Sequence, residues 1–173
     1  MKFNKTYFKM SASIFISLLI TGVFSFMSIP LALILKGFFT VFFSGIMPTI
    51  ILFVFIYQTS YQQGWRDPNR VKLGQETFTP LKGFIVGLAA FLPSLLLLIL
   101  NIIIKNKTMI FIFRLMNFYT LGFINLFPRT YSAVCFAIFI IGILLSGAAY
   151  LLGYNRISPY ALLVYKKDDN QQK

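Results

Sequence analysis

The chain has 173 residues, of which 58% are hydrophobic and 12% charged, and its formal net charge is +12. Soluble domains carry about 25% charged residues, so a soluble fold of this composition could not cover its surface with polar groups. These values exclude an ordinary soluble domain. They predict one all-α transmembrane bundle over residues 1–173, because a bilayer accepts an apolar exterior.

The first two predicted spans cover residues 8–27 and 33–57. Three lysines, Lys2, Lys5 and Lys9, precede the apolar stretch that starts near Ser11, as in a signal peptide. That apolar run continues too far and lacks a clean cleavage site, so we expect a retained helix. Pro30 and Lys36 predict a tight turn between residues 27 and 37, because proline disfavours helix just before it and lysine prefers the membrane interface.

Residues 58–82 form the most polar internal stretch and are predicted to be a cytoplasmic loop. Asp67, Pro68 and Asn69 suit a tight turn with proline at its second position. The two flanking arginines could pair with Asp67 or present guanidinium groups to phosphates or an acidic partner. The alternative is a turn that only fixes orientation in the membrane. The predicted lipid- or partner-contacting residues of this loop are Trp65, Arg66, Asp67, Asn69 and Arg70.

Two further spans are predicted at residues 83–104 and 131–152. Both contain small residues four positions apart, a spacing that lets helix backbones approach closely. We expect these residues to pack helices within the chain, with a dimer interface as the alternative. The candidate packing residues are Gly83, Gly87, Gly142 and Ser146.

Residues 109–127 are long enough to cross a membrane but carry polar side chains. Arg114, Asn117 and Asn125 would share one helix face with position 121, because they recur at steps of three and four. A narrow polar stripe on an aromatic-rich helix is typical of an interfacial or re-entrant segment. We therefore predict four spans plus such a helix.

Charge counting supports four spans with both termini in the cytoplasm. Basic residues concentrate on the cytoplasmic side of membranes. A fifth span would move the tail outside and make the two sides almost equally basic. With four spans, eleven of the 16 Lys and Arg residues are cytoplasmic: Lys2, Lys5, Lys9, Arg66, Arg70, Lys72, Lys82, Arg156, Lys166, Lys167 and Lys173.

The tail, residues 153–173, is predicted to be a cytoplasmic, interfacial segment with a basic end. Anionic lipid headgroups attract basic residues close to a membrane span. Arg156, Lys166 and Lys167 are therefore further candidates for lipid or partner contact.

A short pattern occurs twice, each time after an even-numbered span. Tyr61-x-x-Gly64-Trp65-Arg66 is similar to Tyr150-x-x-Gly153-Tyr154-x-Arg156. A duplication of two spans would explain the pattern, and parallel repeats occur in membrane transporters. Chance similarity in an aromatic-rich chain is the alternative.

Two stretches resemble parts of small, uncharacterised membrane proteins of Gram-positive bacteria. The first is Gly64-x-Arg66-Asp67-x-Asn69-x-Val71. The second runs from Gly153-Tyr154-x-x-Ile157-Ser158 through Leu163-Val164-Tyr165-Lys166-Lys167. The resemblance implies a bacterial plasma membrane and transfers no role to any residue.

Few residues suited to catalysis are available. The chain has no histidine and one cysteine, Cys135, which disfavours histidine triads, histidine metal sites and thiolate zinc sites. No glycine-rich phosphate loop occurs, and all four carboxylates lie outside the predicted apolar spans. We expect no cofactor, no metal, no enzymatic activity and no nucleic-acid partner.

The predicted function is that of a non-enzymatic accessory or structural subunit of a membrane complex. A basic loop and a basic tail on one side suit docking to lipid headgroups or to another membrane protein. The alternative is a small homo-oligomeric transporter or channel component, which would require self-association because four short helices rarely enclose a path.

Overall fold

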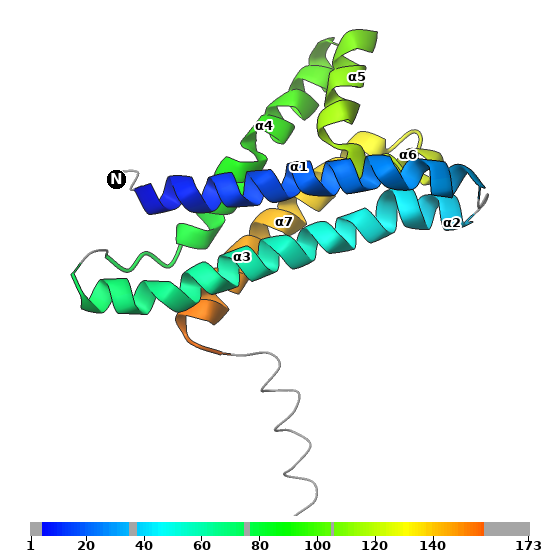
Figure 1. Ribbon diagram of the computed structural model, residues 1–173. Coiled ribbons are helices and arrows are strands. Elements are labelled where there is room, and N and C mark those ends of the chain that lie inside the picture. The colour runs from blue at the N-terminus through cyan, green and yellow to red at the C-terminus, as the bar shows by residue number, and fades with distance from the viewer. Residues whose placement is uncertain (1–4, 35–37, 75–76, 105, 158–173) are drawn as a thin grey trace, which may run out of the picture.

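A computed structural model describes residues 5–34, 38–74, 77–104 and 106–157 (Figure 1). All regular elements in these ranges are helices, which confirms the predicted fold class. They are α1 (Lys5–Ile34), α2 (Phe38–Val41), η1 (Phe42–Ile46), α3 (Met47–Lys72), α4 (Lys82–Ile104), α5 (Lys107–Met116), η2 (Phe118–Thr120), α6 (Phe123–Leu126) and α7 (Tyr131–Tyr154).

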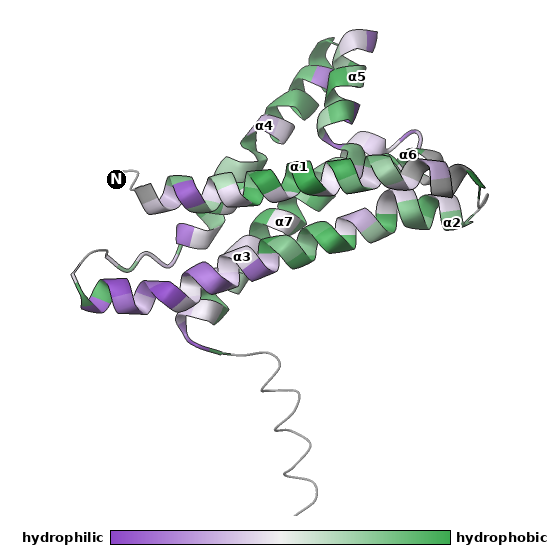
Figure 2. Cartoon of the chain, viewed as in Figure 1, coloured by the Kyte–Doolittle hydropathy of each residue, from purple (hydrophilic) through white to green (hydrophobic). Residues whose placement is uncertain are grey.

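Four helical segments are long and apolar enough to cross a membrane: Thr6–Ser28, Phe38–Lys72, Lys82–Ile104 and Tyr131–Tyr154. Large apolar side chains cover much of their outer surface, as at Ile103, where 71% of the residue is exposed. Such a surface is stable against lipid and unstable against water. Figure 2 shows apolar colour along most of the bundle and polar colour gathered on the last turns of α3.

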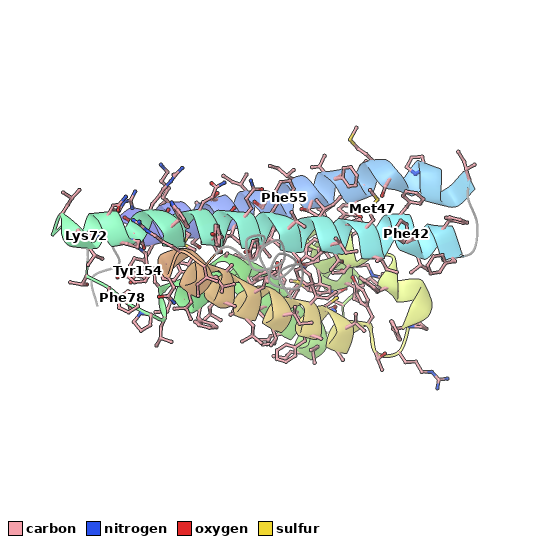
Figure 3. All side chains as sticks on the ribbon, turned by 90° about the horizontal axis from the view of Figure 1, so that it is seen from below. Phe42, Met47, Phe55, Lys72, Phe78 and Tyr154 are labelled. Atoms are coloured by element: carbon pink, nitrogen blue, oxygen red, sulfur yellow. The ribbon has the colours of Figure 1, made fainter. Side chains whose placement is uncertain are left out.

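The helix of the second predicted span does not end near Tyr57, and residues 58–72 are helical where a loop was expected. α2, η1 and α3 form one helical segment of 35 residues. At 1.5 Å per residue this segment is about 52 Å long, against a hydrocarbon core of about 30 Å. Figure 3 shows the segment running past Phe42 and Met47 to Lys72. We call its polar last part, residues 58–72, the α3 arm.

The predicted turn at Asp67, Pro68 and Asn69 is therefore wrong. Pro68 lies inside α3, and the helix ends only at Lys72, before Gly74 at a φ of 67°. One face of the arm stays buried: Ser60, Gly64 and Asp67 continue the spacing of Ile56. Tertiary packing on this face outweighs the local turn preference of an Asp-Pro-Asn sequence.

The first helix is also longer than predicted. α1 continues to Ile34 with Pro30 inside it. The expected turn between residues 27 and 37 is thus helical as far as Ile34, and residues 35–37 lie outside the described ranges.

Residues 107–126 form a bent segment in place of one continuous helix. α5 has ten residues, about 15 Å, which is too short to cross the bilayer. It ends at Met116, so the predicted stripe does not form: Arg114 is exposed whereas Asn117 is buried. The Asn117 amide donates to the Phe113 carbonyl at 2.9 Å and accepts from the Tyr119 hydroxyl at 3.1 Å. This amide stabilises the bend.

The bend is anchored at a π-helical turn. η1 precedes Pro48, which has no N–H to give to the Ser44 carbonyl four residues earlier. That carbonyl instead accepts the Gly122 N–H at 3.1 Å and the Ser25 hydroxyl at 3.3 Å. The Ser25 hydroxyl also lies 3.0 Å from the Phe118 carbonyl. A proline on one span thus removes one intrahelical donor from the carbonyl that holds residues 118–122 against α1 and η1.

The beginnings of α1 and α4 meet the ends of α3 and α7 at one end of the bundle. Arg70 of α3 contacts Thr6 of α1, and Lys82 of α4 contacts both Asp67 of α3 and the Tyr7 ring of α1. We call this end the Asp67 end and the opposite one the Tyr131 end. α1 and α4 therefore begin at the Asp67 end, and α3 and α7 end there. This alternation is expected of a chain that crosses the membrane four times. In Figure 1, α4 and α5 point away from α1 and α2 at the Tyr131 end.

Candidate functional site

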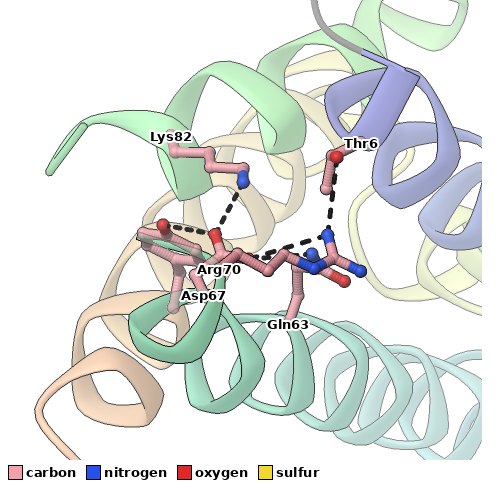
Figure 4. A network of polar contacts seen from close by, with 6 residues as sticks. Thr6, Gln63, Asp67, Arg70 and Lys82 are labelled. Atoms are coloured by element: carbon pink, nitrogen blue, oxygen red, sulfur yellow. Dashed lines mark hydrogen bonds and ion pairs between the residues drawn. The ribbon is translucent and has the colours of Figure 1, made fainter. Parts of the chain in front are cut away.

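A buried ion pair lies at the Asp67 end (Figure 4). The Lys82 ammonium is 2.6 Å from Oδ2 of Asp67, and both side chains are 2% exposed. Two more donors reach the same carboxylate: the Tyr150 hydroxyl at 2.7 Å and the Gln63 amide at 3.0 Å. Burial of a carboxylate is costly unless it is paired and hydrogen-bonded, and here both oxygens have donors.

The network joins all four spans. Gln63 and Asp67 belong to α3, Lys82 to α4 and Tyr150 to α7. Arg70 adds the link to α1: its guanidinium lies 4.0 Å from Asp67 and 3.4 Å from the Thr6 hydroxyl. The arrangement stabilises the relative position of four helix ends.

Lys82, like Gln63 and Thr6, is a member of this network that the sequence did not indicate as a site residue. A cation at a helix N-terminus is unfavourable because the helix dipole is positive there. Asp67 offsets that cost, and the Tyr7 ring adds a cation–π contact, with its centroid 5.1 Å from the ammonium. A lysine directly before an apolar run resembles an ordinary interfacial anchor, so the sequence pattern alone did not reveal a buried pair.

Asp67 was predicted to contact lipid or a partner, and this is wrong because the residue is 1% exposed. Arg70 is half-buried and faces Asp67 and Thr6. Lys166 and Lys167 lie outside the described residues.

Trp65, Arg66, Asn69 and Arg156 are exposed together on the outer side of the α3 arm and the end of α7. The Arg156 guanidinium lies 5.6 Å from the Trp65 ring centroid and donates to Asn69 at 3.1 Å. A hollow of about 400 Å³ lies beside them, lined by Tyr61, Gln62, Trp65 and Arg66. We call the surface formed by Tyr61, Gln62, Trp65, Arg66, Asn69 and Arg156 the arm surface.

Arg156 has a left-handed backbone, with φ of 55°. It follows the C-terminus of α7, where the Ile157 N–H bonds to the Leu152 carbonyl at 3.0 Å in the pattern of a Schellman cap. Glycine is the usual residue at this position, because a side chain there costs about 1–2 kcal/mol. The strained arginine is held over Trp65, which gives the arm surface its second exposed cation.

The repeated pattern brings its two copies into direct contact. A methyl group on Gly64 would overlap the Tyr150 carbonyl, and one on Gly153 would overlap the Tyr61 carbonyl. α3 and α7 run parallel, since Ser60 bonds to Ser146 and Gly64 meets Tyr150 further along both helices. The approach is close enough for weak Cα–H···O contacts. Gly64 and Tyr61 of α3 thus contact Tyr150 and Gly153 of α7 reciprocally, and whether the two stretches arose by duplication stays a hypothesis.

The four candidate packing residues lie inside the bundle. Ser146 donates to the Gly83 carbonyl at 2.9 Å and bonds to the Ser60 hydroxyl at 3.0 Å. Gly87 faces the Ser146 side chain, and a methyl group on Gly142 would meet the Phe91 ring at 2.6 Å. These positions join α7 to α3 and α4 within one chain, so they are not accessible to a second copy.

Comparisons of the chain with protein-family models, with curated proteins and with solved structures give no match.

Proposed function

We propose that this protein is a non-enzymatic accessory or structural subunit of a membrane protein complex, and that its partner binds to the arm surface. The observation that supports the proposal is the α3 arm itself. It is a helical extension whose inner face is held to α4 by the Asp67–Lys82 pair. Its outer face exposes Trp65 and Arg66.

The arm lies where a partner could reach it. α4 begins at Lys82 and α7 ends at Tyr154, so the hydrocarbon boundary falls near these residues, and residues 66–72 of α3 continue beyond it. A rigid helix loses little conformational entropy on binding, unlike a flexible loop. The arm therefore favours docking to a partner with a defined surface.

The chemistry of the arm surface also suits a protein partner. Tryptophan, tyrosine and arginine are enriched where alanine substitution weakens interfaces most. Trp65 is 44% exposed and stands at the end of a row of neighbouring rings, with centroid distances of 5.7 Å from Tyr57 to Tyr61, which are stacked, and 6.1 Å from Tyr61 to Trp65, which are tilted. The two exposed guanidinium groups favour an acidic partner surface.

We further propose a bacterial cytoplasmic membrane, with the Asp67 end on the cytoplasmic side. The described basic residues at this end outnumber those at the Tyr131 end, and this asymmetry favours a cytoplasmic position. The first group is Lys5, Lys9, Arg66, Arg70, Lys72, Lys82 and Arg156, and the second is Lys107, Arg114 and Arg129.

Cross-linking in native membranes, followed by purification of the tagged chain and mass spectrometry, tests the proposal. The wild type and a Lys9→Glu control should capture the same membrane protein, whereas Arg66→Glu should lose most of it. Both variants change the charge equally on exposed side chains of the Asp67 end. A partner retained equally by Arg66→Glu would contradict the arm surface. Cross-links between copies of this chain alone would contradict the accessory role and favour the homo-oligomeric transporter or channel.

A further inference from the structure

A groove of about 310 Å³ lies at the Tyr131 end, away from the arm surface. It is bounded by the end of α4, by α5 and by the connection that leads into α7. Its polar lining includes Asn101, Arg114, Arg129 and Ser132. Since α4 ends at Ile104 and α7 begins at Tyr131, the groove lies at the depth of the lipid headgroups.

Two uncompensated cations line the groove. Among the described residues, neither Arg114 nor Arg129 forms an ion pair or a hydrogen bond, and both are exposed. The one carboxylate in the described ranges, Asp67, is at the opposite end and paired with Lys82. Paired guanidinium groups bind phosphate oxygens with strong, charge-assisted hydrogen bonds. The groove is therefore complementary to an anion.

The groove is also lined by an asparagine whose buried hydrogen-bond acceptor lacks a donor. Oδ1 of Asn101 is buried and has no hydrogen-bond partner in the described part of the chain. A buried acceptor without a donor is costly, and groups of this kind call for a ligand or a solvent molecule. Asn101 as a whole is only partly buried and lines the groove, so a rotation of its side chain would bring Oδ1 to a ligand there. A phosphate diester cannot supply a proton to this oxygen, whereas a hydroxyl group next to the phosphate can.

The remaining lining is apolar. Ile102, Ile110, Phe113 and Pro128 line the same groove as the two arginines. Apolar walls beside cationic groups match a molecule that has an anionic head and a hydrocarbon tail, and a freely soluble anion would gain nothing from them.

We propose that this groove binds the headgroup of an anionic glycerophospholipid that carries free hydroxyls, such as phosphatidylglycerol. Arg114 and Arg129 contact the phosphate, and Asn101 accepts a hydrogen bond from a headgroup hydroxyl. The inference does not depend on the proposed docking role, because the two surfaces lie at opposite ends of the bundle.

Native mass spectrometry of the detergent-purified full chain tests this site, with dioleoyl phosphatidylglycerol and dioleoyl phosphatidylcholine as probes. The wild type should retain phosphatidylglycerol in preference to phosphatidylcholine. Arg114→Gln with Arg129→Gln should weaken that retention at least about tenfold, because two charge-assisted contacts are lost. The matched control, Lys9→Gln with Lys72→Gln, removes two exposed cations at the other end and should stay within about twofold of the wild type.

Two further experiments identify the ligand. Asn101→Ala should reduce the preference for phosphatidylglycerol over dioleoyl phosphatidic acid, which lacks the headgroup hydroxyls. Glycerol 1-phosphate in excess should not displace the bound lipid, because it lacks the tail. Equal loss in the arginine and lysine variants would overturn the proposal by showing general charge attraction. Displacement by glycerol 1-phosphate would overturn it in favour of a site for small anions.

Discussion

The ammonium group of Lys82 lies 2.6 Å from the carboxylate of Asp67, and both residues are enclosed where four membrane spans meet. The contact joins the end of α3 to the start of α4. Because Tyr150 donates to the same oxygen, α7 is held by it as well.

Replacing only one partner of this pair should be strongly destabilising. Asp67→Leu leaves the Lys82 charge buried without its partner, and breaking a buried pair in this way costs about 3–5 kcal/mol. Asp67→Leu combined with Lys82→Met should recover most of that loss, because no unpaired charge remains. The free energy of unfolding, from SDS titration of purified protein, measures both. A double variant as unstable as the single one would show that the pair itself supplies the stability.

Adding one methyl group at the crossing of α3 and α7 should also destabilise the bundle. In Gly64→Ala or Gly153→Ala the new side chain overlaps a carbonyl of the facing helix, and overpacking costs about 1–3 kcal/mol. Gly22→Ala is the matched control, since its nearest neighbour, Cβ of Phe118, would be 3.9 Å away. That change should be neutral or stabilising by up to about 1 kcal/mol. Similar losses in the three variants would argue against a close crossing.

The single cysteine reports on the bent segment between α5 and α7. Cys135 is fully buried, and its sulfur lies 3.6 Å from the Thr120 hydroxyl. We expect slow reaction of the folded protein with a maleimide. Gly122→Leu should accelerate the reaction, because a side chain at this position collides with Gly45 and Ser44 and displaces the segment that covers the thiol. Unchanged labelling in Gly122→Leu, or rapid labelling of the wild type, would contradict this packing.

Substitution of Arg156 should weaken docking while changing the stability of the protein little. Arg156→Gly removes the cost of a left-handed arginine, about 1–2 kcal/mol, and loses a cation–π contact worth about 0.5–1 kcal/mol. The free energy of unfolding should therefore change by less than about 1.5 kcal/mol. Capture of the cross-linked partner should nevertheless fall, since the arm surface loses a cation. Undiminished capture would remove Arg156 from the docking surface.

The spans could be predicted because the hydrocarbon core imposes a minimum length and excludes charge. The α3 arm could not be predicted, because its polar composition and its Asp-Pro-Asn sequence favour a loop with a turn, although one face of it packs as a helix. The spacing of Ile56, Ser60, Gly64 and Asp67 was the available signal. A helix-period reading of residues 56–67 would have placed Asp67 on the packed side.

The bend at residues 117–120 could not be predicted from the sequence for a different reason. The sequence predicted that residues 109–127 would form an interfacial or re-entrant segment, and the charge distribution favoured that prediction. The position of the bend depends on acceptors supplied by other helices, including the Ser44 carbonyl, to which Pro48 has no N–H to donate. Contacts between residues so distant in sequence cannot be read from local patterns.

Cysteine accessibility in membranes tests the four-span arrangement most directly. In a Cys135→Ala background, single cysteines would replace Lys9, Lys72, Lys107, Arg129 and Arg156, all of which are exposed. An impermeant maleimide applied to intact cells should label positions 107 and 129 only. Applied to inverted vesicles, it should label 9, 72 and 156 only. Labelling of position 107 from the same side as position 72 would contradict the account.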